Sequence, residues 1–178
     1  QALIDGAKSM RVRPLLHLST LTQEGTFSNE LAHTVLTDGA VQNRLAASLL
    51  ETIQQKGYRG LDVDFEFVYP EDAAAYAAFI ARMRESLSPL GLPVFVALVP
   101  KTSADQRGDL YEGHDYRLLG EAADFVFLMT YEWGYTYGPP MAVAPLRNVE
   151  LVVDYALSEI PAEKIWMGIP NYGYDWTL

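Results

Sequence analysis

The sequence contains no cysteine, few basic residues and no long apolar run. The lack of cysteine excludes disulfide scaffolds and thiolate metal sites, and it leaves the cellular compartment open. Acidic residues outnumber basic residues by 23 to 13, so we expect no general nucleic-acid-binding surface, which would need clustered Lys and Arg. The longest apolar runs have the length of strands, so no membrane span is expected. The chain begins at Gln1 without a basic and apolar leader, so we expect any targeting signal to lie outside it.

The rest of the composition is that of an ordinary globular protein. Hydrophobic residues make up 49% and charged residues 20% of the 178 residues, which excludes disordered, collagen-like and low-complexity chains. No linker-like stretch interrupts the sequence. We therefore expect one domain over residues 1–178.

Five strand-like segments alternate with helix-like segments. The predicted strands cover residues 12–18, 61–67, 94–99, 125–131 and 165–170. They are rich in Val, Leu, Phe and Ile, as expected for strands that helices cover. Strict alternation of strand and helix predicts a parallel sheet with right-handed crossovers.

The predicted helices lie between these strands. After a polar loop, Asp38 is placed to cap a helix and Gly57 to end it. The apolar face of this helix is Val41, Leu45, Leu49 and Ile53. Residues 70–72 suit a first helical turn. The apolar face that follows is Tyr76, Phe79, Ile80, Met83 and Leu87. Residues 101–121 are mostly polar loop with a short helix near the end. The apolar face of the last predicted helix, which Pro161 stops, is Val149, Val152, Val153, Ala156 and Ile160.

An open doubly wound sheet and a (β/α)8 barrel both fit this alternation. No GxGxxG or GxxxxGK[ST] motif follows any strand, which favours the barrel over a nucleotide-binding sheet. A typical barrel uses about 31 residues per unit, so a chain of this length holds between five and six of the eight units.

Acidic residues alternate with apolar ones along the second predicted strand. Asp62, Asp64 and Glu66 share one face of it, and the apolar residues Leu61, Val63, Phe65 and Phe67 share the other. Carboxylates this close in a barrel interior favour a shared proton, which raises the pKa of at least one of them. Such a group can protonate a leaving group near neutral pH. The alternatives are a solvent-facing strand of an antiparallel sheet, or a carboxylate metal site that includes His17, His33 or His114, none of which has ligand spacing to another.

The segment GLDVDFEF resembles the DxxDxDxE signature of the family 18 glycoside hydrolases, the chitinase family, on the fourth strand of their barrel. The resemblance implies that Glu66 is the general acid and base. It implies that Asp64 orients the substrate acetamido group and that Asp62 is the buried partner of Asp64. The first Asp of the pattern falls on Arg59, at the strand entrance, where we expect the substitution to affect packing more than chemistry.

A second segment supports the same resemblance. Residues 129–132 resemble the Met-x-Tyr-Asp motif of the sixth barrel strand, with Glu132 in place of Asp. This implies that the Tyr131 hydroxyl binds the acetamido carbonyl. Residues 100–106, 131–135, 138–145 and 169–176 are similar to the branch that contains spore cortex-lytic N-acetylglucosaminidases. The substrate-binding residues that we predict from these segments are Met129, Glu132, Trp133, Asn171, Tyr172 and Asp175.

The resemblance implies a retaining O-glycosyl hydrolase without cofactor or metal. Its partner would be an N-acetylglucosamine-containing polysaccharide, either peptidoglycan of the spore cortex or chitin, and its location would be extracytoplasmic, at the spore or cell wall. Chitin or chito-oligosaccharides as substrate, a non-catalytic glycan-binding relative and a metal-dependent barrel hydrolase are the alternatives. No wall-binding LysM-like module is expected within these residues.

The resemblance also aligns the five predicted strands with the third to seventh of an eight-stranded TIM barrel. This partial barrel would lack the first two strands and the eighth strand. It would also lack a Trp that lies late in the family's sequence and forms the floor of the −1 sugar site. Two sheet edges would then be open. We therefore expect either an inactive fragment of a larger enzyme or self-association through the open edges.

Overall fold

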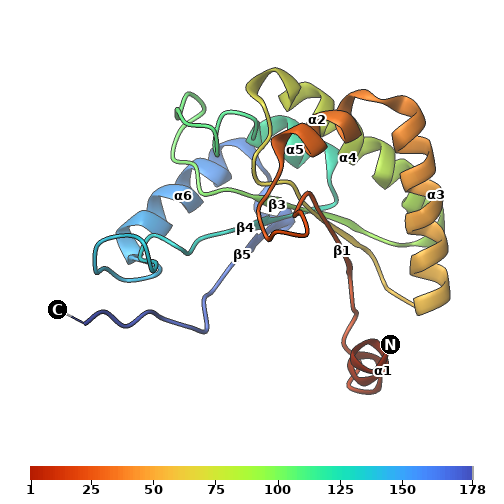
Figure 1. The fold of residues 1–178 in the computed structure, drawn as a ribbon, viewed down its shortest axis with the longest axis horizontal. Helices are drawn as coiled ribbons and strands as arrows, with labels where there is room; N and C mark the ends of the chain where they lie inside the picture. Colours follow the sequence, from red (N-terminus) through yellow and green to blue (C-terminus); the bar gives the residue numbers. More distant parts are fainter. Residues whose placement is uncertain (178) are drawn as a thin grey trace.

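The computed structural model describes residues 1–177 and contains one sheet of five parallel strands, as predicted. The strands are β1 (Leu16–Ser19), β2 (Leu61–Asp64), β3 (Val94–Leu98), β4 (Phe125–Leu128) and β5 (Ile165–Met167). Their spatial order is β1-β2-β3-β4-β5, so each strand pairs with its neighbour in the sequence. A doubly wound sheet would reverse this order at a switch point, whereas a TIM barrel keeps it. The sheet is therefore a barrel arc (Figure 1).

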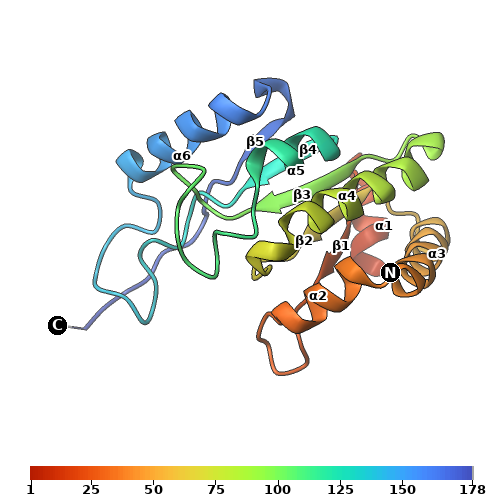
Figure 2. The same ribbon diagram turned by 90° about the horizontal axis from the view of Figure 1, so that it is seen from above.

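Helices cover one face of this arc. They are α2 (Asn29–Thr37), α3 (Gly39–Lys56), α4 (Ala73–Leu87), α5 (Tyr116–Ala122) and α6 (Leu146–Glu159). The first helix, α1 (Ala2–Ser9), lies apart from this layer, below β1 in Figure 1. Figures 1 and 2 show α3, α4, α5 and α6 following one another along the same side of the sheet. The hydrophobic core lies between the two layers, where Phe65 stacks on Tyr76 and Phe79 with ring centroids 5.5 and 5.7 Å apart.

The predicted helix signals have their expected roles. The Asp38 carboxylate accepts hydrogen bonds from the backbone N–H groups of Ala40 and Val41 at the start of α3. Gly57 ends this helix with a left-handed φ of 77°, a conformation that glycine adopts without steric cost. Residues 70–72 form a separate 3-10 turn ahead of α4 rather than its first turn. The predicted short helix is α5.

Two helices and several strand ends also differ from the sequence-based expectation. The helices α1 and α2 were not predicted, because one lies in an unpatterned segment and the other follows a polar loop. The Ser28 side chain caps α2 by accepting a hydrogen bond from the Leu31 N–H. The strand β1 begins four residues later than predicted, because residues 12–15 do not pair with β2. The strands β2, β4 and β5 end earlier than predicted, so Glu66 and Tyr131 lie past the last paired residue. The apolar pattern continues after the backbone has left the sheet, and only the pairing shows where a strand stops. Within residues 1–177, no helix has the length and apolarity needed to cross a membrane.

The face of the sheet opposite the helices is lined by aromatic rings. Phe95 stacks on Phe125 with a centroid distance of 4.9 Å, and the edge of Trp166 meets Phe95 at 5.4 Å. These rings form a cavity with Phe127, Asp62, Arg13 and Arg59, among others. This face corresponds to the barrel interior, and it carries the acidic residues of β2.

Candidate active site

The alternation along residues 61–66 separates the side chains as predicted, whereas Phe67 is only partly buried and does not join the core. Leu61, Val63 and Phe65 are at most 1% exposed beneath the helices. Asp62, Asp64 and Glu66 are partly exposed on the opposite side. Glu66 lies two residues beyond the strand, at the carboxyl end of the sheet where TIM barrels build their sites.

The pKa of Glu66 is raised to about 7. Burial is the main cause, and the negative charges of Asp64 and Glu132 add to it. The pKa of Asp64 is also raised, chiefly by burial, with His17 acting against the shift and Asp62 adding to it. The sequence predicted a raised pKa from repulsion between carboxylates, whereas burial contributes more. A carboxyl group that titrates near neutrality can both give and take a proton at working pH.

The two aspartates face a histidine on the neighbouring strand. The Nδ1 atom of His17 is 2.9 Å from Oδ2 of Asp62, and its Nε2 atom is 3.9 Å from Oδ2 of Asp64. The Oδ1 atom of Asp64 is buried and has no hydrogen-bond partner among residues 1–177. A buried carboxylate oxygen is costly to leave unpaired, so this atom is suited to a donor that arrives with a ligand.

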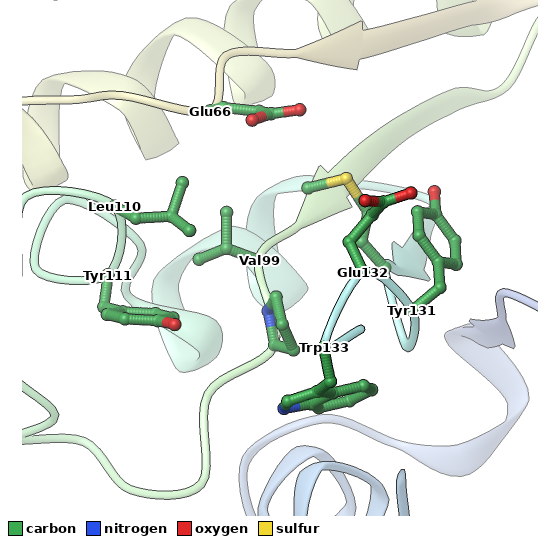
Figure 3. A pocket seen from close by; sticks show the side chains of 9 residues that line it. Glu66, Val99, Leu110, Tyr111, Tyr131, Glu132 and Trp133 are labelled. Atoms are coloured by element: carbon green, nitrogen blue, oxygen red, sulfur yellow. The ribbon is translucent and has the colours of Figure 1, made fainter. Parts of the chain in front are cut away.

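Glu66 faces several predicted site residues across a pocket at the end of β4 (Figure 3). The predicted residues that line this pocket with Glu66 are Met129, Tyr131, Glu132 and Trp133. Leu110 and Tyr111 approach from the connection between β3 and α5, and sequence reasoning missed both of them. They lie in a polar loop without apolar periodicity, so no local signal marks them.

Tyr131 and Glu132 have distinct surroundings. Burial and the surrounding carboxylates raise the pKa of Tyr131, so its hydroxyl stays protonated and can donate a hydrogen bond. Glu132 has a left-handed φ of 67°. Its Oε1 atom accepts hydrogen bonds from the hydroxyls of Tyr172 at 2.6 Å and Tyr174 at 2.9 Å. Glu132 and Tyr172, both predicted to bind substrate, therefore bind each other.

The remaining predicted residues lie near the carboxyl end of the chain. Asn171 and Asp175 are exposed and do not line the pocket beside Glu66. The ring of Tyr172 meets Tyr174 edge-on at a centroid distance of 6.0 Å. The roles of these residues in substrate binding stay predictions.

His114 supports the backbone at Glu66. It is fully buried, and its Nε2 atom lies 3.0 and 2.9 Å from the carbonyl oxygens of Phe65 and Glu66. Burial lowers the pKa of His114 to about 4, so the ring is neutral near pH 7 and Nε2–H can donate to these carbonyls. The buried Lys101 in turn donates from Nζ to the carbonyl of His114 at 2.9 Å. The sequence suggested His114 only as a metal ligand. Within the part of the chain that the structure describes, no group of three or more His, Asp or Glu residues could hold a metal ion.

Comparisons with known proteins agree with this geometry. Residues 22–178 match the model of the family described as glycosyl hydrolases family 18. The "Cortical fragment-lytic enzyme" of Bacillus subtilis is 48% identical over 164 residues, which are 92% of this chain and 38% of that protein. The crystal structure of the Bacillus megaterium spore cortex-lytic enzyme SleL superposes with a TM-score of 0.94 at 43% identity, covering 100% of this chain and 40% of that one.

A chitinase is similar too. The chitinase structure from Chromobacterium violaceum has a TM-score of 0.91 at 32% identity and covers 98% of this chain and 55% of that one. The chain thus spans about 40% of the length of the first two relatives and about half of the chitinase.

Proposed function

The chain belongs to the family 18 glycosyl hydrolases, and we propose that it contributes the catalytic carboxylates of a retaining N-acetylglucosaminidase. The proposed substrate is spore cortex peptidoglycan, and the proposed site of action is the spore or cell wall. The names of the relatives that act on the cortex support this choice. The observation that carries the proposal is the position of Glu66, whose pKa is raised to about 7 and which faces Tyr131 across a pocket.

In the proposed first step, protonated Glu66 gives its proton to the glycosidic oxygen while the C1–O bond breaks. The carbonyl oxygen of the substrate's own 2-acetamido group attacks C1 and forms a cyclic oxazolinium ion. Family 18 is a known substrate-assisted exception among glycosidases, which more often use a second carboxylate for this attack.

Asp64 and Tyr131 would hold the acetamido group during this attack. The buried Oδ1 atom of Asp64, which has no hydrogen-bond partner among residues 1–177, would accept a hydrogen bond from the acetamido N–H. Its negative charge would stabilise the positive charge that develops on the ring. The protonated hydroxyl of Tyr131 would donate to the acetamido carbonyl and fix its direction of attack.

In the second step, Glu66 is a carboxylate and acts as the base. It takes a proton from water, whose oxygen attacks C1 and reopens the oxazolinium ring. Two displacements at C1 leave its configuration unchanged, and Glu66 is protonated again for the next cycle.

Glu66→Gln tests the proposal, because glutamine keeps the shape of the side chain but cannot transfer the proton. We expect turnover of cortex peptidoglycan by the full-length protein to fall by about 10³-fold or more, with an unchanged circular dichroism spectrum. Glu71→Gln, at an exposed position in the turn before α4, is the matched control and should keep full activity. Full activity of the Glu66 variant would refute the assignment.

Chitin is the second candidate substrate, and the similarity to a chitinase structure at 32% identity supports it. The mechanism would be the same. Digesting cortex peptidoglycan and chitin side by side, with mass analysis of the new reducing ends, separates the two substrates. Sugar binding without any product in either digest would instead favour a non-catalytic glycan-binding protein.

A further inference from the structure

His17 occupies a special position beside the acidic residues of β2. The parallel register pairs His17 of β1 directly with Asp62, and Ser19 with Asp64. The ring extends along this row, so that Nδ1 is 2.9 Å from the Asp62 carboxylate and Nε2 is 3.9 Å from that of Asp64. The Nδ1 contact is a hydrogen bond to Asp62, whereas Nε2 is too far from Asp64 for one, so a protonated ring would act on Asp64 through its charge.

The charges around this contact are mostly negative. Asp62 and Asp64 come from β2, Glu66 from the segment just after it and Glu132 from the segment after β4, beside the uncharged hydroxyl of Tyr131. Arg13 and Arg59 line the neighbouring aromatic cavity together with Asp62. Within residues 1–177, His17 is the only basic side chain with a nitrogen within 4.0 Å of a carboxylate oxygen of Asp62 or Asp64.

We propose that His17 is a positioning residue of the hydrolytic reaction, which anchors Asp62 and balances the charge of the Asp62–Asp64 pair. Asp64 is then free to keep an ionised oxygen directed at the substrate acetamido group. This inference rests on the proposed function, because it acts through the role of Asp64 in that mechanism. It goes beyond the acidic motif itself, which contains no cationic partner.

The charge of His17 changes the pKa of Asp64, and the sign of that change predicts how the pH profile shifts when His17 is replaced. The positive charge of His17 lowers the pKa of Asp64 and so opposes the effect of burial. Without that charge the pKa of Asp64 rises further, and the ionised form is lost at a higher pH. The acidic limb of the pH profile should therefore move upward. The alkaline limb belongs to Glu66, whose shift arises from burial, Asp64 and Glu132, so it should stay in place.

The experiment compares His17→Gln and His17→Ala in the full-length protein. Glutamine retains a hydrogen-bond donor but carries no charge, whereas alanine removes both. In both variants we expect the midpoint of the acidic limb of the kcat/KM pH profile to move to higher pH by about 0.5 to 1 unit. At the optimum, kcat should fall about 10-fold or more for alanine and less for glutamine, with KM changed less than kcat.

His33 provides a matched control. Its Nδ1 atom is 2.7 Å from the Asp72 carboxylate and its side chain is 50% exposed, close to the 55% of His17, but its ionic partner is Asp72 rather than Asp62 or Asp64. His33→Gln should leave the pH profile unchanged. A shift of the acidic limb in the His33 variant as well would show a general charge effect and overturn the proposal.

A second measurement does not depend on activity. Carbon-13 NMR of labelled aspartate follows the Asp64 carboxyl, identified by its loss in Asp64→Asn, and its titration should move to higher pH in His17→Gln. An unchanged Asp64 titration together with an unchanged pH profile would overturn the role of His17. Failure of the proposed function is distinguishable, because the wild-type protein would then release no product or Glu66→Gln would stay active.

Discussion

The two faces of β2 are built from neighbouring residues but have opposite properties. Toward the helices, Leu61 and Val63 are 0% exposed and belong to the continuous hydrophobic core. Toward the barrel interior, burial and the charges of Asp64 and Glu132 raise the pKa of Glu66, and an Asp64 oxygen has no hydrogen-bond partner among residues 1–177. One face therefore lowers the free energy of the fold, and the other holds charged groups in a state that costs free energy.

This difference separates stability from activity within a few residues. When a side chain whose partners all lie in the core is shortened, the free energy of unfolding of the protein falls. A side chain whose partner is the transition state does not, because that partner is absent from the folded protein without substrate. Substitutions on opposite faces should therefore affect different measurements.

Asp64→Asn should have the largest effect on kcat/KM after the loss of turnover expected for Glu66→Gln. Asparagine keeps the size of the side chain but cannot offer a negative charge to the oxazolinium ion, so we expect kcat/KM to fall by about 10² to 10³-fold. The free energy of unfolding at pH 7 should not decrease, because the substitution removes a carboxylate that burial disfavours. Steady-state kinetics and urea unfolding measure the two quantities. Asp154→Asn, exposed on α6, is the control for a general loss of charge. If Asp64→Asn destabilised the fold by several kcal/mol, the two faces would not be separable.

Val63→Ala should have the opposite pattern. It removes two methyl groups from a side chain that is 0% exposed, which costs about 2 kcal/mol of unfolding free energy. The neighbouring carboxylates of Asp62 and Asp64 stay on the opposite side of the strand, so kcat should change by less than about three-fold. Val12→Ala is the matched control, because Val12 is 54% exposed and its substitution should leave the unfolding free energy within about 0.5 kcal/mol of the wild type. A large loss of kcat without loss of stability in Val63→Ala would contradict the separation.

The fold follows largely from local pattern. Strand-length apolar runs, apolar positions at helical spacing, the Asp38 cap and the helix end at Gly57 are short-range features, and they predict the order of the elements and the bounds of α3. The ends of the strands could not be predicted, because they depend on where neighbouring backbones stop pairing. The helix α2 was missed because its three buried residues, Ala32, Val35 and Leu36, are too few to show a period above the polar residues around them.

The site follows from the sequence only where its residues belong to a motif. The alternation of β2 and the segment after β4 identify Glu66 and Tyr131 as candidates, and the structure brings both to one pocket. The pairing of His17 with Asp62 depends on strand register, and that of His114 with Glu66 depends on how a long loop packs. Neither contact has a local pattern, so both residues could be named from the sequence only as candidate metal ligands.

The smallest expected effect is a gain in stability from Glu66→Gln. The pKa of Glu66 is raised from 4.5 to about 7 by folding, so between these values the folded protein keeps a proton that the unfolded chain has released. Stability therefore falls as the pH rises through this window and stays lowered above it. Glutamine does not titrate, so the variant should be about 1 to 2 kcal/mol more stable than the wild type at pH 8, after allowance for the partial exposure of Glu66. At pH 4.5 the two proteins should be nearly equal in stability.

Urea unfolding at both pH values measures this difference, with Glu71→Gln as the exposed control. Because the same substitution should abolish turnover, a stabilised but inactive protein would show that the proposed proton-transferring group, Glu66, is also a group whose burial costs free energy. Equal or lower stability of Glu66→Gln at pH 8 would instead show that folding does not strain this carboxylate.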